Sequence, residues 1–144
     1  KPENVMVDLR GHPYLMDFDT TRAIPRRPKK SALTSGTPGY MAPEQLKGEP
    51  HDQRADVYAF GVVAYELLTH QRPFEGRNPA ESRRLQLDEN HRPNLPSKFN
   101  PGVPHLINRI ILKCLEHNPD QRYPNMTILN AQLHVALGVK MEKI

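Results

Sequence analysis

The chain has 144 residues, 37% hydrophobic and 25% charged, which is typical of one folded domain. Its single cysteine excludes an internal disulfide, and no apolar run reaches the roughly 18 residues of a membrane-spanning helix. The net charge of +4 is local, because residues 22–30 hold five basic residues and no acid. A nucleic-acid interface would spread basic and aromatic residues over a folded face, so we expect no nucleic-acid partner.

A small β-hairpin is the first predicted element. Residues 4–7 and 14–16 are β-prone runs, and turn-forming residues separate them. Residues 17–44 then have the composition of a long loop, rich in proline, glycine and small hydroxyls. A helix is expected to begin near Pro43, because proline is favoured in the first turn of a helix.

Residues 54–69 form the most apolar stretch, and they predict a buried central helix. One helical face carries Val57, Phe60, Val63, Ala64, Leu67 and Leu68, and Tyr58, Ala59, Val62 and Tyr65 cover much of the other. The stretch is too short and too polar at its ends to span a bilayer.

Three further helices are predicted. Asn78 is expected to cap one that runs to about residue 88, with Glu81 completing a capping box. Apolar residues between 103 and 115 recur at helical spacing, with Leu106 on the apolar face. A last helix is expected between an Asn125 cap and Gly138, with Met126, Leu129, Leu133 and Leu137 on one face. The predicted fold is therefore mainly α (α+β overall), with one short hairpin and about five helices around the central one.

Six short motifs occur in a fixed order. They are KPEN (1–4), DFD (17–19), GTPGYMAPE (36–44), ADVYAFG (55–61), RPF (72–74) and PDQRYP (119–124). Together they resemble the C-terminal lobe of eukaryotic-type Ser/Thr protein kinases, and the wording of the central helix resembles such kinases of bacteria. The resemblance implies that residues 1–144 are that lobe and residues 17–44 its activation segment. It implies a parent protein that transfers the γ-phosphate of ATP to Ser or Thr of protein substrates.

The resemblance assigns a nucleotide and metal site at the ends of the hairpin. It makes Asn4 and Asp17 ligands of Mg²⁺, a hard cation that prefers oxygen donors, and the hairpin can bring the two residues together. It places Lys1 on the transferred phosphate, as a catalytic residue, and Glu3 near the nucleotide. From the residues alone, Asn4 and Asp17 could instead cap strand ends, and Glu3 could be a plain surface acid.

The resemblance also makes Thr37 a catalytic-site residue that accompanies Ser/Thr specificity. It places Tyr40 in the substrate site, although Tyr40 could equally be a core residue. The activation segment is expected to receive protein substrates.

Ser31, Thr34 and Ser35 are candidate phosphorylation sites on the activation segment. The basic residues of 22–30 could hold such a phosphate, could attract an acidic substrate, or could form a solvated loop.

Three charged residues are predicted to be structural. Glu44 and Arg122 match a family ion pair that joins the activation segment to the helical lobe, the alternative being two separate surface charges. Asp56 matches an aspartate that bonds the backbone of the family's catalytic loop. It could also complement the positive N-terminal end of the central helix.

Two departures from the family pattern qualify the function. Asp19 stands where the family has glycine, and aspartate is one of few residues that tolerate the backbone angles of glycine. The family's catalytic base and N-terminal lobe precede Lys1, so the 144-residue piece alone is expected to be inactive. It is also expected to self-associate through apolar surface near Leu9, Leu15 and Met16.

A pseudokinase or scaffold lobe that binds proteins stays open as the alternative function. We expect a cytoplasmic location, with any membrane tether outside this stretch.

Overall fold

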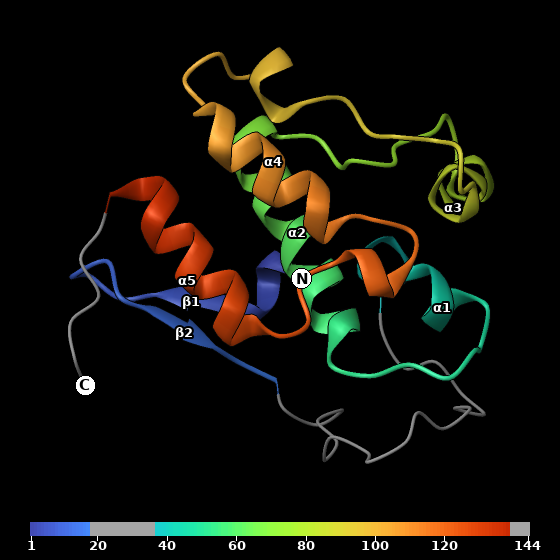
Figure 1. The fold of residues 1–144 in the computed structure, drawn as a ribbon, viewed down its shortest axis with the longest axis horizontal. Helices are drawn as coiled ribbons and strands as arrows, with labels where there is room; N and C mark the ends of the chain where they lie inside the picture. The colour runs from blue at the N-terminus through green and yellow to red at the C-terminus, as the bar shows by residue number, and fades with distance from the viewer. Residues whose placement is uncertain (18–36, 139–144) are drawn as a thin grey trace.

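The computed structural model describes residues 1–17 and 37–138 (Figure 1). The chain forms strands β1 (Val5–Val7) and β2 (Pro13–Leu15) and helices α1 (Pro43–Leu46), α2 (Arg54–Thr69), α3 (Pro79–Leu87), α4 (His105–Cys114) and α5 (Met126–Leu137). Four short 3-10 helices join them, namely η1 (Pro2–Asn4), η2 (Pro38–Tyr40), η3 (Pro96–Lys98) and η4 (Pro119–Gln121). The mainly α fold with one short hairpin and five helices is thereby confirmed.

Helix α2 is the centre of the fold, as predicted, and packs chiefly against α4, with α5, η2 and η3 around it (Figure 1). Its bounds agree with the predicted helix, but its buried face differs. Tyr58, Val62 and Tyr65 are buried, whereas Leu67, predicted to be buried, is exposed. The helix ends at His70, whose left-handed φ of 57° stops the helical hydrogen bonding.

Close backbone approach between α2 and α4 depends on Gly61. A Cβ at Gly61 would lie 2.7 Å from Cβ of Cys114 and 3.1 Å from Cδ2 of Leu115. The buried side of α4 includes Ile107, Ile110 and Ile111, but Leu106, predicted on this face, is exposed. The apolar spacing therefore predicted the helix correctly but placed Leu106 wrongly on its buried face.

The predicted helix caps are partly confirmed. Asn125 accepts the backbone N–H of Ile128 at 2.9 Å, and Gly138 ends α5 in the left-handed region at a φ of 64°. Asn78 accepts the N–H of Glu81 at 2.9 Å. The carboxylate of Glu81, however, accepts from the backbone and side chain of Arg77 rather than from the backbone of Asn78, so the capping box is only half formed.

Helix α5 buries less than its sequence pattern predicts. Leu129 is fully buried and Leu133 is partly buried against the core. Met126 and Leu137, predicted on the same face, are exposed. None of the helices in the described part of the chain combines the length and apolarity that crossing a bilayer requires.

Candidate nucleotide and substrate site

The hairpin is held by its turn, which Asp8 organises. One carboxylate oxygen of Asp8 accepts the backbone N–H groups of Arg10 and His12 at 2.8 and 2.9 Å. These bonds, with the N–H of His12 contributing most, lower the pKa of Asp8. The strands pair antiparallel with Val5 opposite Leu15. Strand β1 begins one residue later than predicted, and β2 begins and ends one residue earlier than predicted. The turn thus sets the register that brings residues 4 and 16 together.

Asn4 and Asp17 both lie at the open end of this hairpin. The N–H of Met16 donates to the carbonyl oxygen of Asn4 at 2.7 Å, and Asp17 follows directly. Asp17 has a φ of 64°, a left-handed conformation that few residues other than glycine adopt. Within the described residues, no hydrogen bond occupies the Asn4 amide or the Asp17 carboxylate. As far as the described residues go, both groups can ligate a cation, and amide and carboxylate oxygens are donors that Mg²⁺ accepts.

Lys1 and Glu3 lie on the turn that leads into β1. Lys1 precedes η1 and is exposed, and its carbonyl oxygen accepts the N–H of Asn4 at 3.0 Å. Glu3 is exposed on η1, and its charge contributes to the raised pKa of Tyr40. The charge of Glu3 on η1 thus reaches Tyr40 on η2, although Asn4 and Thr37 are 33 positions apart in the chain. The candidate residues come from the two ends of the hairpin and from the start of segment 37–44.

Tyr40 is anchored to the central helix. Its hydroxyl donates to Oε2 of Glu66 at 2.6 Å. Burial, followed by this bond and the charge of Glu66, raises the pKa of Tyr40. Tyr40 also packs on the hydrophobic core, so the core interpretation and the substrate-site prediction are compatible. Thr37, at the start of η2, is exposed, and within the described residues no hydrogen bond joins its side chain to Lys1.

Glu44 and Arg122 form the predicted ion pair, and it is buried. Nη1 and Nη2 of Arg122 donate to the two carboxylate oxygens of Glu44 at 2.7 and 2.8 Å. The other guanidinium hydrogens reach the backbone oxygens of Arg54, Glu116 and His117. The ring of Tyr58 lies 5.0 Å from the guanidinium carbon. This pair fastens α1, and with it the end of segment 37–44, to the loop that precedes α5.

Asp56 opens the first turn of α2 and has a different environment. Its side chain reaches solvent, and no donor among the described residues forms a hydrogen bond with it. Partial loss of hydration nevertheless raises its pKa, and nearby His51 opposes that rise. The helix-dipole interpretation fits this position, whereas its partner in the family's catalytic loop lies outside residues 1–144.

Two residues near segment 37–44 were missed by sequence reasoning. Buried Gln86 of α3 donates to the carbonyl oxygen of Met41 at 2.6 Å, and Arg72 lies against Gly39. Glutamine carries no motif signal, so Gln86 could not have been found. Arg72 belongs to the RPF motif, which was noted only for its resemblance.

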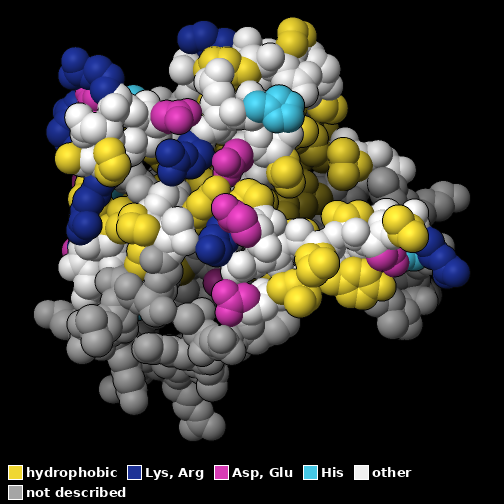
Figure 2. All heavy atoms as spheres, turned by 180° about the vertical axis from the view of Figure 1, so that it is seen from behind, with side chains coloured by type: hydrophobic (Ala, Val, Ile, Leu, Met, Phe, Trp, Pro, Cys, Tyr) yellow, Lys and Arg dark blue, Asp and Glu magenta, His cyan; other side chains and the backbone are white. Residues whose placement is uncertain are grey.

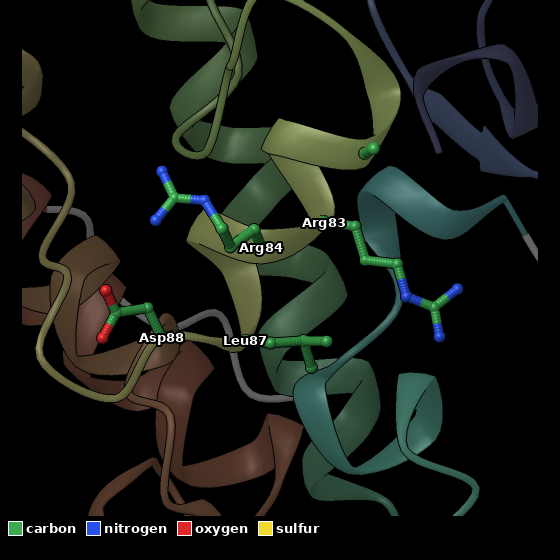
Figure 3. Close-up of a pocket in the computed structure, with 5 residues that line it drawn as sticks. Arg83, Arg84, Leu87 and Asp88 are labelled. Atoms are coloured by element: carbon green, nitrogen blue, oxygen red, sulfur yellow. The ribbon is translucent and has the colours of Figure 1, made fainter.

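Helix α3 carries a shallow hollow of about 510 Å³, which is shown in Figure 3. It is lined by Ala80, Arg83, Arg84, Leu87 and Asp88. Arg83 extends toward α1, where it donates to the carbonyl oxygen of Leu46 at 3.0 Å, and Arg84 points the other way. The hollow contains none of the candidate nucleotide or substrate residues.

Several sequence predictions lie outside the described residues. These are the candidate phosphosites Ser31, Thr34 and Ser35, the basic residues of 22–30, and Asp19. In the part of the chain that is described, no group of three or more His, Cys, Asp or Glu side chains could hold a metal ion. Asn4 and Asp17 are a smaller set, of a kind that would need ligands from a nucleotide.

Comparisons with known proteins agree with the motifs. The protein kinase domain family matches residues 1–134. The probable serine/threonine-protein kinase SCO3848 of Streptomyces coelicolor is 36% identical over 140 residues, which cover 95% of this chain and 20% of that protein. Serine/threonine-protein kinase PknB of Mycobacterium leprae is 35% identical over 135 residues, covering 92% and 21%. PknB of Mycobacterium tuberculosis is 35% identical over 136 residues, with the same coverage. The chain thus spans about one fifth of the length of these relatives.

Proposed function

Because the chain belongs to the protein kinase domain family, we propose that it is the C-terminal lobe of a Ser/Thr protein kinase. The parent protein transfers the γ-phosphate of ATP to Ser or Thr of protein substrates, and residues 17–44 are its activation segment. Relatives from three bacteria that carry the name serine/threonine-protein kinase support this proposal. ATP and Mg²⁺ are typical of the family.

The proposal for the site rests on the hairpin, in which Met16 bonds Asn4 and Asp17 follows directly, and on the fact that none of the described residues hydrogen-bonds to either side chain. These two residues would hold Mg²⁺, and Lys1 would contact the transferred phosphate. A bound Mg²⁺ would neutralise charge on the phosphates. Glu3 would face the nucleotide, and Thr37 would complete the catalytic site as the residue that accompanies Ser/Thr specificity. Asp56 would support the backbone of the catalytic loop that precedes Lys1 in the family.

Protein substrates would bind along residues 37–41, where Tyr40 is held rigidly by Glu66 and the core. Phosphorylation at Ser31, Thr34 or Ser35 would regulate this surface by adding charge that basic residues can pair with. Because Tyr40 is held in place next to the segment that carries the candidate phosphorylation sites, it could form part of a peptide-binding surface. The Glu44–Arg122 pair would keep the end of that segment in place.

The test uses the full-length protein that contains this chain. It should transfer labelled phosphate from ATP to Ser or Thr of a peptide mixture when Mg²⁺ is present. Asp17→Asn and Asn4→Ala should each reduce transfer to near background, because the first removes the negative charge that attracts Mg²⁺ and the second removes an oxygen ligand. Asp88→Asn, directly after α3 and outside the candidate site, is the matched control and should retain activity. Full activity of Asp17→Asn would contradict the proposed metal site.

A pseudokinase or scaffold lobe is the second candidate, because Asp19 replaces the family's glycine. A full-length protein that binds partner proteins but transfers no phosphate, even with Asp19→Gly restored, would favour this candidate. We also propose that the polypeptide of residues 1–144 alone transfers no phosphate, since it lacks the catalytic-base segment. Measurable ATP-dependent transfer by that purified polypeptide would contradict this.

A further inference from the structure

The loop that follows α2 places the guanidinium group of Arg72 against residues 37–41, the segment that we propose binds substrate. Pro73 is buried, and the ring of Phe74 stacks on Tyr58 with 6.4 Å between centroids. These two residues fix the loop, so Arg72 is held beside η2. An ideal Cβ on Gly39 would lie only 2.9 Å from Nη1 of Arg72 and 3.8 Å from its Cδ. Arg72 therefore covers the face of Gly39 where any other residue would carry a side chain.

The positive charge of Arg72 is available to a partner. Its side chain is exposed, and among the described residues no carboxylate oxygen lies within 4 Å of its guanidinium nitrogens. Glu66 of α2, the acid that contacts η2, is already engaged by the Tyr40 hydroxyl at 2.6 Å. The positive charge of Arg72 also acts on Tyr40, because it partly offsets the rise in the pKa of the Tyr40 hydroxyl. Within the described residues, Arg72 therefore has no counter-ion in direct contact.

We propose that Arg72 determines substrate specificity by pairing with a carboxylate side chain of the protein substrate. The substrate class is a Ser/Thr segment that carries Asp or Glu at the position lying over Gly39. A guanidinium group binds a carboxylate through two parallel hydrogen bonds, so the contact is geometrically selective as well as attractive. This inference rests on the proposed kinase function.

The surrounding charges make the preference position-dependent. Glu3 is exposed on η1 and would favour a basic substrate residue near itself, on the η1 side of Tyr40. Glu66 is occupied by Tyr40, which reduces its competition for a substrate cation. An acidic preference is therefore confined to the substrate position that contacts Arg72, and it does not extend along the whole peptide.

The experiment compares peptides that share one neutral background and one phosphoacceptor serine. Glu, Gln or Lys is placed at each flanking position in turn, and kcat/KM is measured with the full-length protein and ATP. At one position the wild-type protein should prefer Glu over Gln by roughly 3- to 5-fold, the range that a partly exposed ion pair supports. Arg72→Glu should reverse the preference at that position toward Lys, Arg72→Gln should remove it, and Arg72→Lys should retain part of it.

Two further variants make the result specific. Arg84→Glu, on the exposed face of α3, makes the same charge change elsewhere and should leave the preference unchanged. Gly39→Ala should weaken the preference without changing any charge, because its Cβ displaces the guanidinium end of a flexible side chain. Unchanged peptide ranking in both Arg72→Glu and Arg72→Gln, with turnover of the neutral peptide retained, would overturn the inference alone. No phosphorylation of any peptide by the wild-type protein would overturn the proposed kinase function as well.

Discussion

At the scale of single residues, the buried pair Glu44–Arg122 is the contact whose loss should cost most. Arg122 is 4% exposed and Glu44 6%, and all five guanidinium hydrogens are used. Arg122→Ala should lower the free energy of unfolding by about 3–5 kcal/mol, because it leaves a buried carboxylate without a partner. Urea denaturation of the polypeptide of residues 1–144 would measure the change.

The matched control for that prediction is Arg77→Ala. Arg77 also pairs with a glutamate, Glu81, but its side chain is 90% exposed. Its loss should cost about 0–1 kcal/mol. Equal losses for Arg77→Ala and Arg122→Ala would contradict the assignment of a buried, structurally important pair.

His117 predicts a pH dependence of stability. Burial first, and then the charge of Lys47, lower its pKa, while Glu89 acts in the opposite direction. The unfolded state therefore binds this proton more readily than the folded state. The free energy of unfolding should fall as the pH drops below about 6.5, the ordinary histidine value, and should level off below the folded-state pKa. His117→Gln should reduce this dependence in denaturation curves recorded across that range, and an unchanged curve would contradict the prediction.

The sequence predicted a residue's contacts best where the family motifs name both the residue and its side-chain partner. Glu44 and Arg122 stand 78 positions apart, yet the two motifs that contain them predicted the pair, and the structure confirms it. Gln86 and the Arg72–Gly39 contact were not predictable, because their partners are backbone atoms. Backbone partners leave no pattern in side-chain chemistry, so such contacts are visible only after folding.

At the scale of elements, helices were predictable and their buried faces only partly so. The bounds of α2 and both caps of α5 follow from apolar content, an asparagine and a glycine. Leu67, Leu106 and Leu137 have the right period but lie exposed, because the period does not say which arc of a helix meets its neighbours. The packing partner decides that, and for α2 the partner is chiefly α4.

The α2–α4 contact gives a prediction for this scale. Gly61→Ala places a Cβ 2.7 Å from Cβ of Cys114, which is part of a packed helix and cannot swing away. The resulting strain should outweigh the gain in helix propensity and destabilise the domain by about 1–3 kcal/mol. Thermal and urea denaturation would measure it.

Gly102→Ala is the control for this prediction. There the new Cβ would meet only the side-chain oxygen of Asn100, at 3.3 Å. A stability change much smaller than that of Gly61→Ala is expected. If Gly61→Ala instead stabilised the domain, the helices would have room to separate and the close-packing argument would be wrong.

At the scale of the whole molecule, the fold class and the central helix were predictable because the motifs occur in order over most of the chain. The apolar surface expected near Leu9, Leu15 and Met16 is exposed in the structure, and it extends over both strands of the hairpin. Both faces of the two-stranded hairpin are exposed, because successive side chains of a strand point to opposite faces. The exposed apolar residues of the hairpin and its flanks are Val5, Met6, Val7, Leu9, Tyr14, Leu15 and Met16. Figure 2 shows apolar side chains gathered on the side where the hairpin lies.

This uncovered hairpin predicts how the polypeptide of residues 1–144 behaves in solution. Leu15 is 63% exposed and Val7 also 63%, so the strands offer apolar side chains at an unpaired sheet edge. The polypeptide should self-associate as its concentration rises, and light scattering coupled to size-exclusion chromatography should report a mass above the 16.5 kDa of one chain. Val7→Lys with Leu15→Lys should shift the mass toward that of one chain. Leu95→Lys, an exposed leucine away from the hairpin, should not do so. A constant monomer mass at every concentration would show that the hairpin does not mediate association.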